Sequence, residues 1–284
     1  EFYTFTGQAD EIYPDSGTQI GSFRALNNPL PDGQTTDPGS PQSVGWKILS
    51  DVIKTDRALI DRKVNLQSEH IRSLEAGARS LGRYFQDQFL NGTGTSDTIT
   101  GLKNIITSNS QVIKFDTVNG GSVPAGDSDA DRTQQRKFLE QLDKIIYAMN
   151  PDALVMNADM IARLESIAKQ WLRVDRIQNA VNKTQRIYDY KGVILIESGN
   201  KKDDSTPVIT NSEVVGTSND CTSIYIVKFG ERDDTTFPTT ETGLKVVHNP
   251  KAGNFVITDI ELQYNLAVIK KKKAIRLSGI RLNA

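Results

Sequence analysis

The stretch of sequence that decides the fold covers residues 65–90 and reads NLQSEHIRSLEAGARSLGRYFQDQFL. Asn65 is a suitable N-cap, and Asn91-Gly92 is a typical helix end. At 1.5 Å per residue, a helix of about 25 residues is about 37 Å long. This is long for a globular domain, and it predicts a rod that lies across a flat plate. Apolar residues recur at spacings of three and four, in one stripe along that helix: Ile71, Leu74, Ala78, Leu81, Phe85 and Phe89.

The residues before this helix predict a long hairpin. Short β-type runs occupy residues 18–23 and 44–49, and residues 27–43 between them hold four of the ten prolines. Two extended runs around a tip rich in proline and glycine are typical of a hairpin. A lone two-stranded hairpin is at best marginally stable in water, so its aromatic residues Phe23 and Trp46 need a partner surface. We infer that another copy of the same chain provides it.

The rest of the chain predicts a mixed domain and a returning strand. Helices are expected at residues 131–149 and after Asn157, which is a suitable N-cap, and a buried strand is expected at 153–156. Apolar runs at 192–196 and 224–229 are typical of central strands. Residues 99–106 and 112–115 predict short strands or turns, and residues 172–190 are too polar to assign. Within residues 255–269, large apolar side chains occupy every second position from Ile260 to Val268, as in a half-buried antiparallel strand. The fold class is α+β.

Charge is balanced over the 284 residues, at −1, which gives no reason to expect bulk binding of nucleic acid. It is unevenly placed, however. In residues 1–46, six acids face one arginine, a net charge of −5, whereas residues 267–284 carry six basic residues and no acid, a net charge of +6. Two interpretations are open. Either both ends are simply solvated, or acidic arms lie against the basic ends of neighbouring subunits, an attraction that salt would weaken.

No pattern of catalytic, cofactor-binding or metal-binding residues emerges. His70 and His248 lie far apart without metal-ligand spacing, and Cys221 has no neighbouring histidine to activate it and no partner for a disulfide. The acidic run at 231–234 is expected to be a solvated loop. If the lysine run at 270–273 forms a strand, alternate side chains point to opposite faces, so no more than two lysines share one surface. No membrane span or signal peptide is visible.

Four short motifs, in their order and spacing, resemble the major capsid proteins of tailed bacteriophages, the Hong-Kong-ninety-seven fold that encapsulins share. FLNGTG at residues 89–94, followed by Gly101-Leu102, is similar to the transition from the family's spine helix to a loop of its peripheral domain. ALVMN at 153–157 and YIVKFGE at 225–231 are similar to strands of its axial domain. NFV at 254–256 is similar to the return to the peripheral domain.

The resemblance implies an N-terminal arm at 1–17 and an extended hairpin, the E-loop, at 18–55. It implies a peripheral domain at 56–127 and 255–284, with the spine helix at about 66–90, and an axial domain at 128–254. It further implies self-assembly as hexamers and pentamers into an icosahedral shell around double-stranded DNA, held without sequence specificity. The chain would be a virion protein assembled in the host cytoplasm, with portal and decoration proteins as further partners. Cleavage of a scaffolding segment would explain a chain that begins at Glu1.

Contacts between subunits are expected from the arm and the hairpin, through aromatic and aliphatic anchors: Phe2, Tyr3, Phe5, Phe23, Leu26, Leu30, Trp46 and Ile48. Some family members join subunits through a lysine–asparagine isopeptide bond. Residues 27–45 contain no lysine, and Thr258 and Asn265 fall where the asparagine and the acid would be wanted, so we expect a non-covalent shell. Two other readings stay open: an encapsulin-type compartment around a cargo enzyme, and an enzyme with an unrecognised site.

Overall fold

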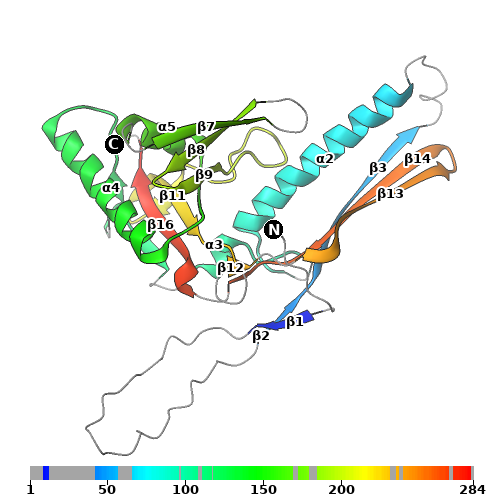
Figure 1. Cartoon of the computed structure of the whole chain (residues 1–284), viewed down its shortest axis with the longest axis horizontal. Helices are drawn as coiled ribbons and strands as arrows, with labels where there is room; N and C mark the ends of the chain where they lie inside the picture. The colour runs from blue at the N-terminus through cyan, green and yellow to red at the C-terminus, as the bar shows by residue number, and fades with distance from the viewer. Residues whose placement is uncertain are drawn as a thin grey trace, which may run out of the picture.

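The structure is a computed structural model, and it describes residues 9–12, 42–56, 66–95, 97–107, 111–116, 118–168, 172–178, 184–230, 235–236, 239–268 and 271–282. Two bodies lie side by side, and a narrow two-stranded ribbon leaves the base of one of them (Figure 1). The first body consists of a long helix on a three-stranded sheet. The second is a larger mixed sheet with helices.

The long helix α2 spans Leu66–Asn91 and confirms the helix predicted from the apolar stripe. It lies along a sheet of β13 (Thr239–Ala252), β14 (Phe255–Tyr264) and β3 (Lys47–Asp56), which pair antiparallel in that order. The strand predicted by alternation is β14, and ten consecutive pairs join it to β3. The turn from β13 to β14 places Gly253 at φ +64°, a conformation that glycine adopts without strain.

One face of this sheet is buried by α2. Along β3, Leu49, Ile53 and Thr55 are buried, whereas the alternate residues Ile48 and Val52 are exposed. A Cβ atom at Gly77 of α2 would come within 2.4 Å of Ile53 Cδ1, so the helix approaches the sheet closely only because this position has no side chain. Nearer the C-terminal end of α2, Phe85 packs on Tyr264 with ring centroids 4.9 Å apart.

The second body is a nine-stranded sheet that runs in the order β4-β16-β11-β6-β9-β8-β7, with β10 on β11 and β5 on β16. Its central strands β6 and β11 are buried and apolar, as predicted for residues 153–156 and 224–229. The strands are β4 (Val112–Lys114), β5 (Gly121–Ser122), β6 (Ala153–Met156), β7 (Leu172–Gln178), β8 (Thr184–Tyr190), β9 (Val193–Glu197), β10 (Glu213–Val215), β11 (Ser218–Val227) and β16 (Ala274–Arg281).

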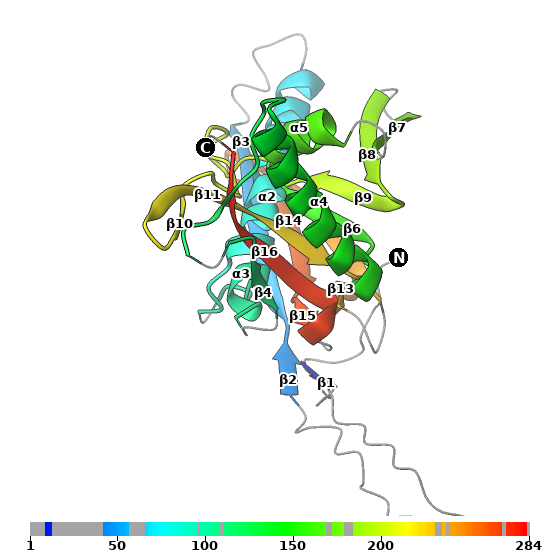
Figure 2. The same ribbon diagram turned by 90° about the vertical axis from the view of Figure 1, so that its left-hand side faces the viewer.

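Two capped helices accompany this sheet (Figure 2). Helix α4 spans Asp129–Met149 and opens with a capping box, in which Ser128 Oγ accepts from the Asp131 N–H and the Asp131 carboxylate accepts from the Ser128 N–H. Helix α5 spans Ala158–Ile167, and the Asn157 side chain accepts from the Met160 N–H at 2.9 Å, as the predicted N-cap requires.

The remaining elements connect the bodies and form the ribbon. Strand β1 (Ala9–Ile12) pairs antiparallel with β2 (Gln42–Gly45), and β12 (Thr235–Thr236) pairs with β15 (Ala267–Val268). Helix α3 (Leu102–Ile105) and a 3-10 turn, Lys271–Lys273, complete the chain. The divisions predicted after residues 17 and 254 separate strands that pair here, β1 from β2 and β13 from β14.

Three sequence predictions differ from the structure. Part of residues 99–106 forms α3 instead of a strand or turn; here the Asn104 side-chain amide donates to the Gly92 carbonyl at 2.6 Å and stabilises a helical turn. Residues 172–190, which the sequence left unassigned, contain the β7–β8 hairpin. Its two strands pair through their backbones, and backbone pairing requires no apolar pattern in the sequence. Strand β9 lies between β6 and β8 as a central strand, but Ile194 and Ile196 are exposed, so only one of its faces is buried.

Candidate assembly surface

Two of the eight predicted contact residues lie within the described residues. Trp46 sits between β2 and β3 and is half-buried, and Ile48 at the start of β3 is 60% exposed. The other six lie outside the described residues: Phe2, Tyr3, Phe5, Phe23, Leu26 and Leu30. The structure therefore brings Trp46 and Ile48 together at the base of the ribbon, and the roles of all eight remain predictions.

A side chain that follows β14 contacts the base of the ribbon. Asn265 Nδ2 donates a hydrogen bond to the Gly45 carbonyl, and Asn265 Oδ1 accepts from the Leu266 N–H at 2.8 Å. Immediately beyond Gly45, Lys47 pairs with Tyr264 and the β3–β14 ladder begins. Asn265, which directly follows β14, thus holds the end of β2 next to the start of this ladder.

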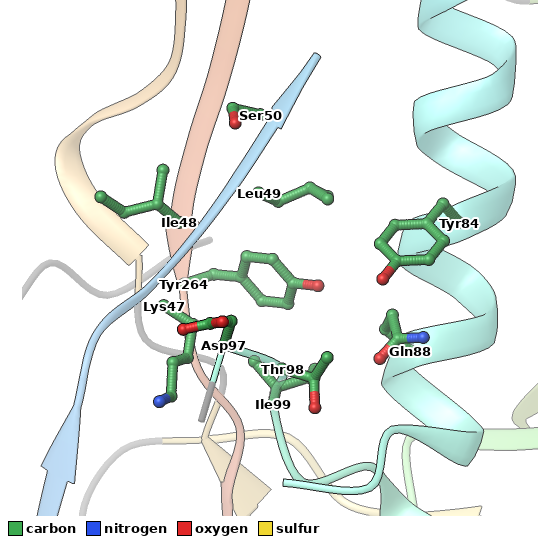
Figure 3. A pocket seen from close by; sticks show the side chains of 10 residues that line it. All are labelled: Lys47, Ile48, Leu49, Ser50, Tyr84, Gln88, Asp97, Thr98, Ile99 and Tyr264. Carbon is green, nitrogen blue, oxygen red and sulfur yellow. The ribbon is translucent and has the colours of Figure 1, made fainter. Parts of the chain in front are cut away.

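A small cup opens beside this attachment, between β3, α2 and the loop at residues 97–99 (Figure 3). Its volume is about 210 Å³. Tyr84 and Gln88 reach into it from α2, and the Tyr264 ring points toward them from the sheet. Burial, with Tyr84 nearby, raises the pKa of Tyr264 to about 12, so its hydroxyl stays neutral. Lys47 and Asp97 add one charge of each sign to the hydroxyl and amide groups of this lining.

The outer face of the three-stranded sheet, opposite α2, carries exposed apolar residues. Register places Val52 of β3, Asp259 of β14 and Val247 of β13 in one row on this face. Ile48, Val52, Val247 and Phe255 are between 42% and 60% exposed. We call these four residues the outer patch. They are spread along the face rather than contiguous, with Asp259 between Val52 and Val247.

Strand β13 forms the edge of this sheet and is exposed on both faces. Leu244 and Val246 share the inner face with the buried residues of β3 but lie beyond the cover of α2, and they are 57% and 55% exposed. Within the described residues, β13 pairs with β14 alone. An apolar edge of this kind is a site for association unless another chain covers it.

The basic end of the chain is partly neutralised within the same chain. Arg276 pairs with Glu213 at 2.8 Å, and Arg281 makes two contacts with Asp220, at 2.8 and 3.0 Å. The arginine lowers the pKa of Asp220, which stays charged. The lysine run does not form the strand that would place alternate lysines on opposite faces, because Lys271–Lys273 is a 3-10 turn.

Chemically reactive groups are sparse on this framework. Cys221 is fully buried, and burial raises the pKa of its thiol, which leaves it protonated and unreactive. Among the described residues, no three His, Cys, Asp or Glu side chains gather as metal ligands. His70 and His248, far apart in sequence, do meet in the first body, with ring centroids 5.4 Å apart. In the described part of the chain, no helix has the length and apolarity to cross a membrane.

Comparison with known proteins identifies the fold. No protein-family model matches the sequence, and no curated protein matches it. The holo-SrpI encapsulin complex from Synechococcus elongatus matches 99% of this chain and 85% of its own, with a TM-score of 0.63 at 13% identity. The capsid of a native GTA particle matches 98% of this chain and 87% of its own, with a TM-score of 0.59 at 13% identity. Microbacterium phage Oxtober96 matches 100% of this chain and 89% of its own, with a TM-score of 0.53 at 9% identity.

The chain therefore has the fold of shell-forming capsid and encapsulin proteins. In particular, this is the Hong-Kong-ninety-seven capsid fold, and the α+β class and family fold predicted from the sequence are confirmed.

Proposed function

We propose that this protein is a structural subunit, without enzymatic activity, that assembles with copies of itself into a closed shell. The ribbon β1–β2 is the observation that carries the proposal, together with the capsid fold. It stands clear of both bodies in two perpendicular views (Figures 1 and 2). A two-stranded ribbon is at best marginally stable in water, and a neighbouring subunit would bury it.

Within this proposal, the chain is a tailed-bacteriophage major capsid protein that forms hexamers and pentamers in an icosahedral shell around double-stranded DNA. The first body would be the peripheral domain, the second the axial domain, and the ribbon the base of the E-loop. The predicted arm and hairpin residues, with the outer patch, would contact neighbouring subunits. DNA would be held without sequence specificity, portal and decoration proteins would be further partners, and the protein would reside in the virion after assembly in the host cytoplasm.

A second candidate is an encapsulin-type compartment, and the similarity to the encapsulin complex at a TM-score of 0.63 favours it. Both candidates need the same subunit contacts, so the shell itself does not distinguish them. Their contents do: a phage capsid holds nucleic acid, whereas an encapsulin holds a cargo protein.

The direct test is the mass and the contents of the purified protein. Sedimentation and electron micrographs should show closed particles, and a stable monomer over a wide concentration range would contradict the proposal. Particles treated with nuclease are then opened and analysed for nucleic acid and for a second polypeptide. Protected double-stranded DNA supports the capsid, and a stoichiometric second protein supports the compartment.

A further inference from the structure

The two histidines of the chain form part of one hydrogen-bonded cluster between α2 and the three-stranded sheet. His70 comes from α2, Thr55 from β3, Thr258 from β14 and His248 from β13, so each element of the first body contributes one side chain. His70 Nδ1 lies 3.0 Å from Thr55 Oγ1, and His70 Nε2 lies 3.4 Å from Thr258 Oγ1. His248 Nδ1 lies 3.0 Å from the same Thr258 oxygen.

Thr258 links the hydrogen bonds of the two imidazoles. Its hydroxyl has a single proton, so it can donate to one ring nitrogen and must accept an N–H from the other. Two neutral histidines satisfy this arrangement. When both are protonated, both ring nitrogens that face Thr258 are donors, and the hydroxyl has no ring acceptor left. Two like charges then face each other, with ring centroids 5.4 Å apart.

We propose that these four residues, the histidine latch (His70, His248, Thr55 and Thr258), hold the first turns of α2 on the sheet at neutral pH and release them when the pH falls. The latch lies in a single subunit, so the inference goes beyond shell formation and does not depend on it. Thr55 and Thr258 are 7% and 1% exposed, and their hydroxyls would lose their ring partners when the helix moves away.

The direction of the pH dependence follows from burial and charge. Partial burial first, and the neighbouring His248 second, lower the pKa of His70 from its ordinary value of 6.5. A histidine with a lowered pKa in the folded state binds its proton less well there than in the unfolded state. The contribution of the latch to stability is therefore present above about pH 6.5 and is lost as the pH falls through the lower, folded value.

Other charged groups around the latch do not neutralise it. On the inner face of β3, Asp51 lies four residues from Thr55, on the order of 13 Å along the strand, and it accepts from the Val52 N–H. On α2, Arg72 is exposed, and Glu75 pairs with Arg79. Among the charged residues of the other two strands whose side chains the structure describes, Lys245 of β13 and Asp259 and Glu261 of β14 lie on the outer face. Among the described residues, no carboxylate forms an ion pair with either imidazole.

Hydrogen–deuterium exchange of the whole chain, in whatever assembly it forms, tests the latch. After correction for intrinsic exchange rates, peptides that cover residues 70–78 and 246–258 should exchange faster at pH 5 than at pH 7.5, since the proton-linked equilibrium shifts toward release as the pH falls from the ordinary pKa of His70 to its lower folded value. Peptides from β6 and β11 in the second body serve as the internal reference and should not change.

Matched variants make the test specific. His248→Gln keeps a hydrogen-bonding side chain but cannot be charged, so it should abolish most of the acid-dependent step, and His70→Gln should do the same. Lys245→Gln, which removes a charge from the outer face of the same strand, should keep the step. The latch is refuted by equal exchange at the two pH values in the wild type, by an unchanged step in both histidine variants, or by a step that includes β6 and β11.

Discussion

The side-chain amide of Asn265 donates a hydrogen bond to the backbone carbonyl of Gly45, which lies 220 residues earlier in the chain. This bond joins the residue after β14 to the last residue of β2, and the β3–β14 ladder begins beside it. It is one of the contacts that can orient the ribbon on the first body.

Asn265→Ala should weaken assembly more than folding. The variant loses one hydrogen bond at the base of the ribbon, which costs about 0.5–1.5 kcal/mol, while the buried cores of both bodies stay intact. We expect a higher protein concentration to be needed for particles, measured by light scattering. Asn254→Ala, at the exposed β13–β14 turn, is the control and should assemble like the wild type. Equal assembly of the two variants would show that the bond does not direct the ribbon.

Trp46→Ala should leave both bodies folded and impair particle formation. Trp46 lies between β2 and β3, and we expect its ring to anchor a contact between subunits, where large aromatic side chains contribute most of the binding energy. Circular dichroism should remain close to that of the wild type, and particles counted in micrographs should decrease. A wild-type yield of particles from this variant would contradict the assignment.

A charge in the outer patch should block assembly without unfolding the subunit. Val52→Asp places a carboxylate on the uncovered face of β3, where it stays hydrated in the free subunit but would be desolvated under a neighbouring chain. Sedimentation should then show smaller species. Lys54→Asp, two residues further along the same face, changes charge without removing an apolar contact and is the control. If Val52→Asp forms normal particles, the outer patch is not an interface.

Gly77→Ala and Gly82→Ala should differ in stability, although both replace glycine in the same helix. Alanine favours a helix over glycine by about 1 kcal/mol, and no atom lies within 4 Å of a Cβ at Gly82. At Gly77 the new methyl group would meet Ile53 Cδ1 at 2.4 Å, and overpacking of this kind costs about 1–3 kcal/mol. Thermal unfolding should rank Gly82→Ala above the wild type and Gly77→Ala below Gly82→Ala.

Particles should dissolve into single chains on a denaturing gel. The predicted hairpin tip, residues 27–45, has no lysine, Asn265 is engaged by Gly45, and Thr258 belongs to the histidine latch. An isopeptide bond between subunits therefore lacks its lysine at the tip. A ladder of covalent multimers after boiling in detergent would overturn this expectation.

Local patterns in the sequence predicted the helices and strands whose formation depends on residue spacing and helix capping. The stripe from Ile71 to Phe89 gave α2, the N-cap at Asn157 gave α5, and alternation gave β14. These signals need only spacing and capping, both of which can be read within a few residues. The shared fold could then be inferred from the order of short motifs.

Structural features that depend on contacts between residues far apart in the sequence could not be predicted from such local patterns. The β7–β8 hairpin is polar, and its pairing leaves no apolar period. Nothing in the spacing of His70 and His248 indicates that they meet, because their contact requires the complete first body. The partial exposure of the stripe on α2, with Ile71 47% exposed, also depends on how far the sheet extends under the helix.

The ten-row ladder between β3 and β14 has a mechanical consequence. Strand β2 leads into β3 through Trp46 alone, so a pull on the ribbon along the strand axis acts lengthwise on that ladder. Backbone bonds loaded in this direction share the force and must break together, whereas bonds at a peeled edge break one after another. If subunits in a particle move apart while their ribbons stay bound to neighbours, the pull would act along β3, the direction in which the β3–β14 ladder resists most strongly.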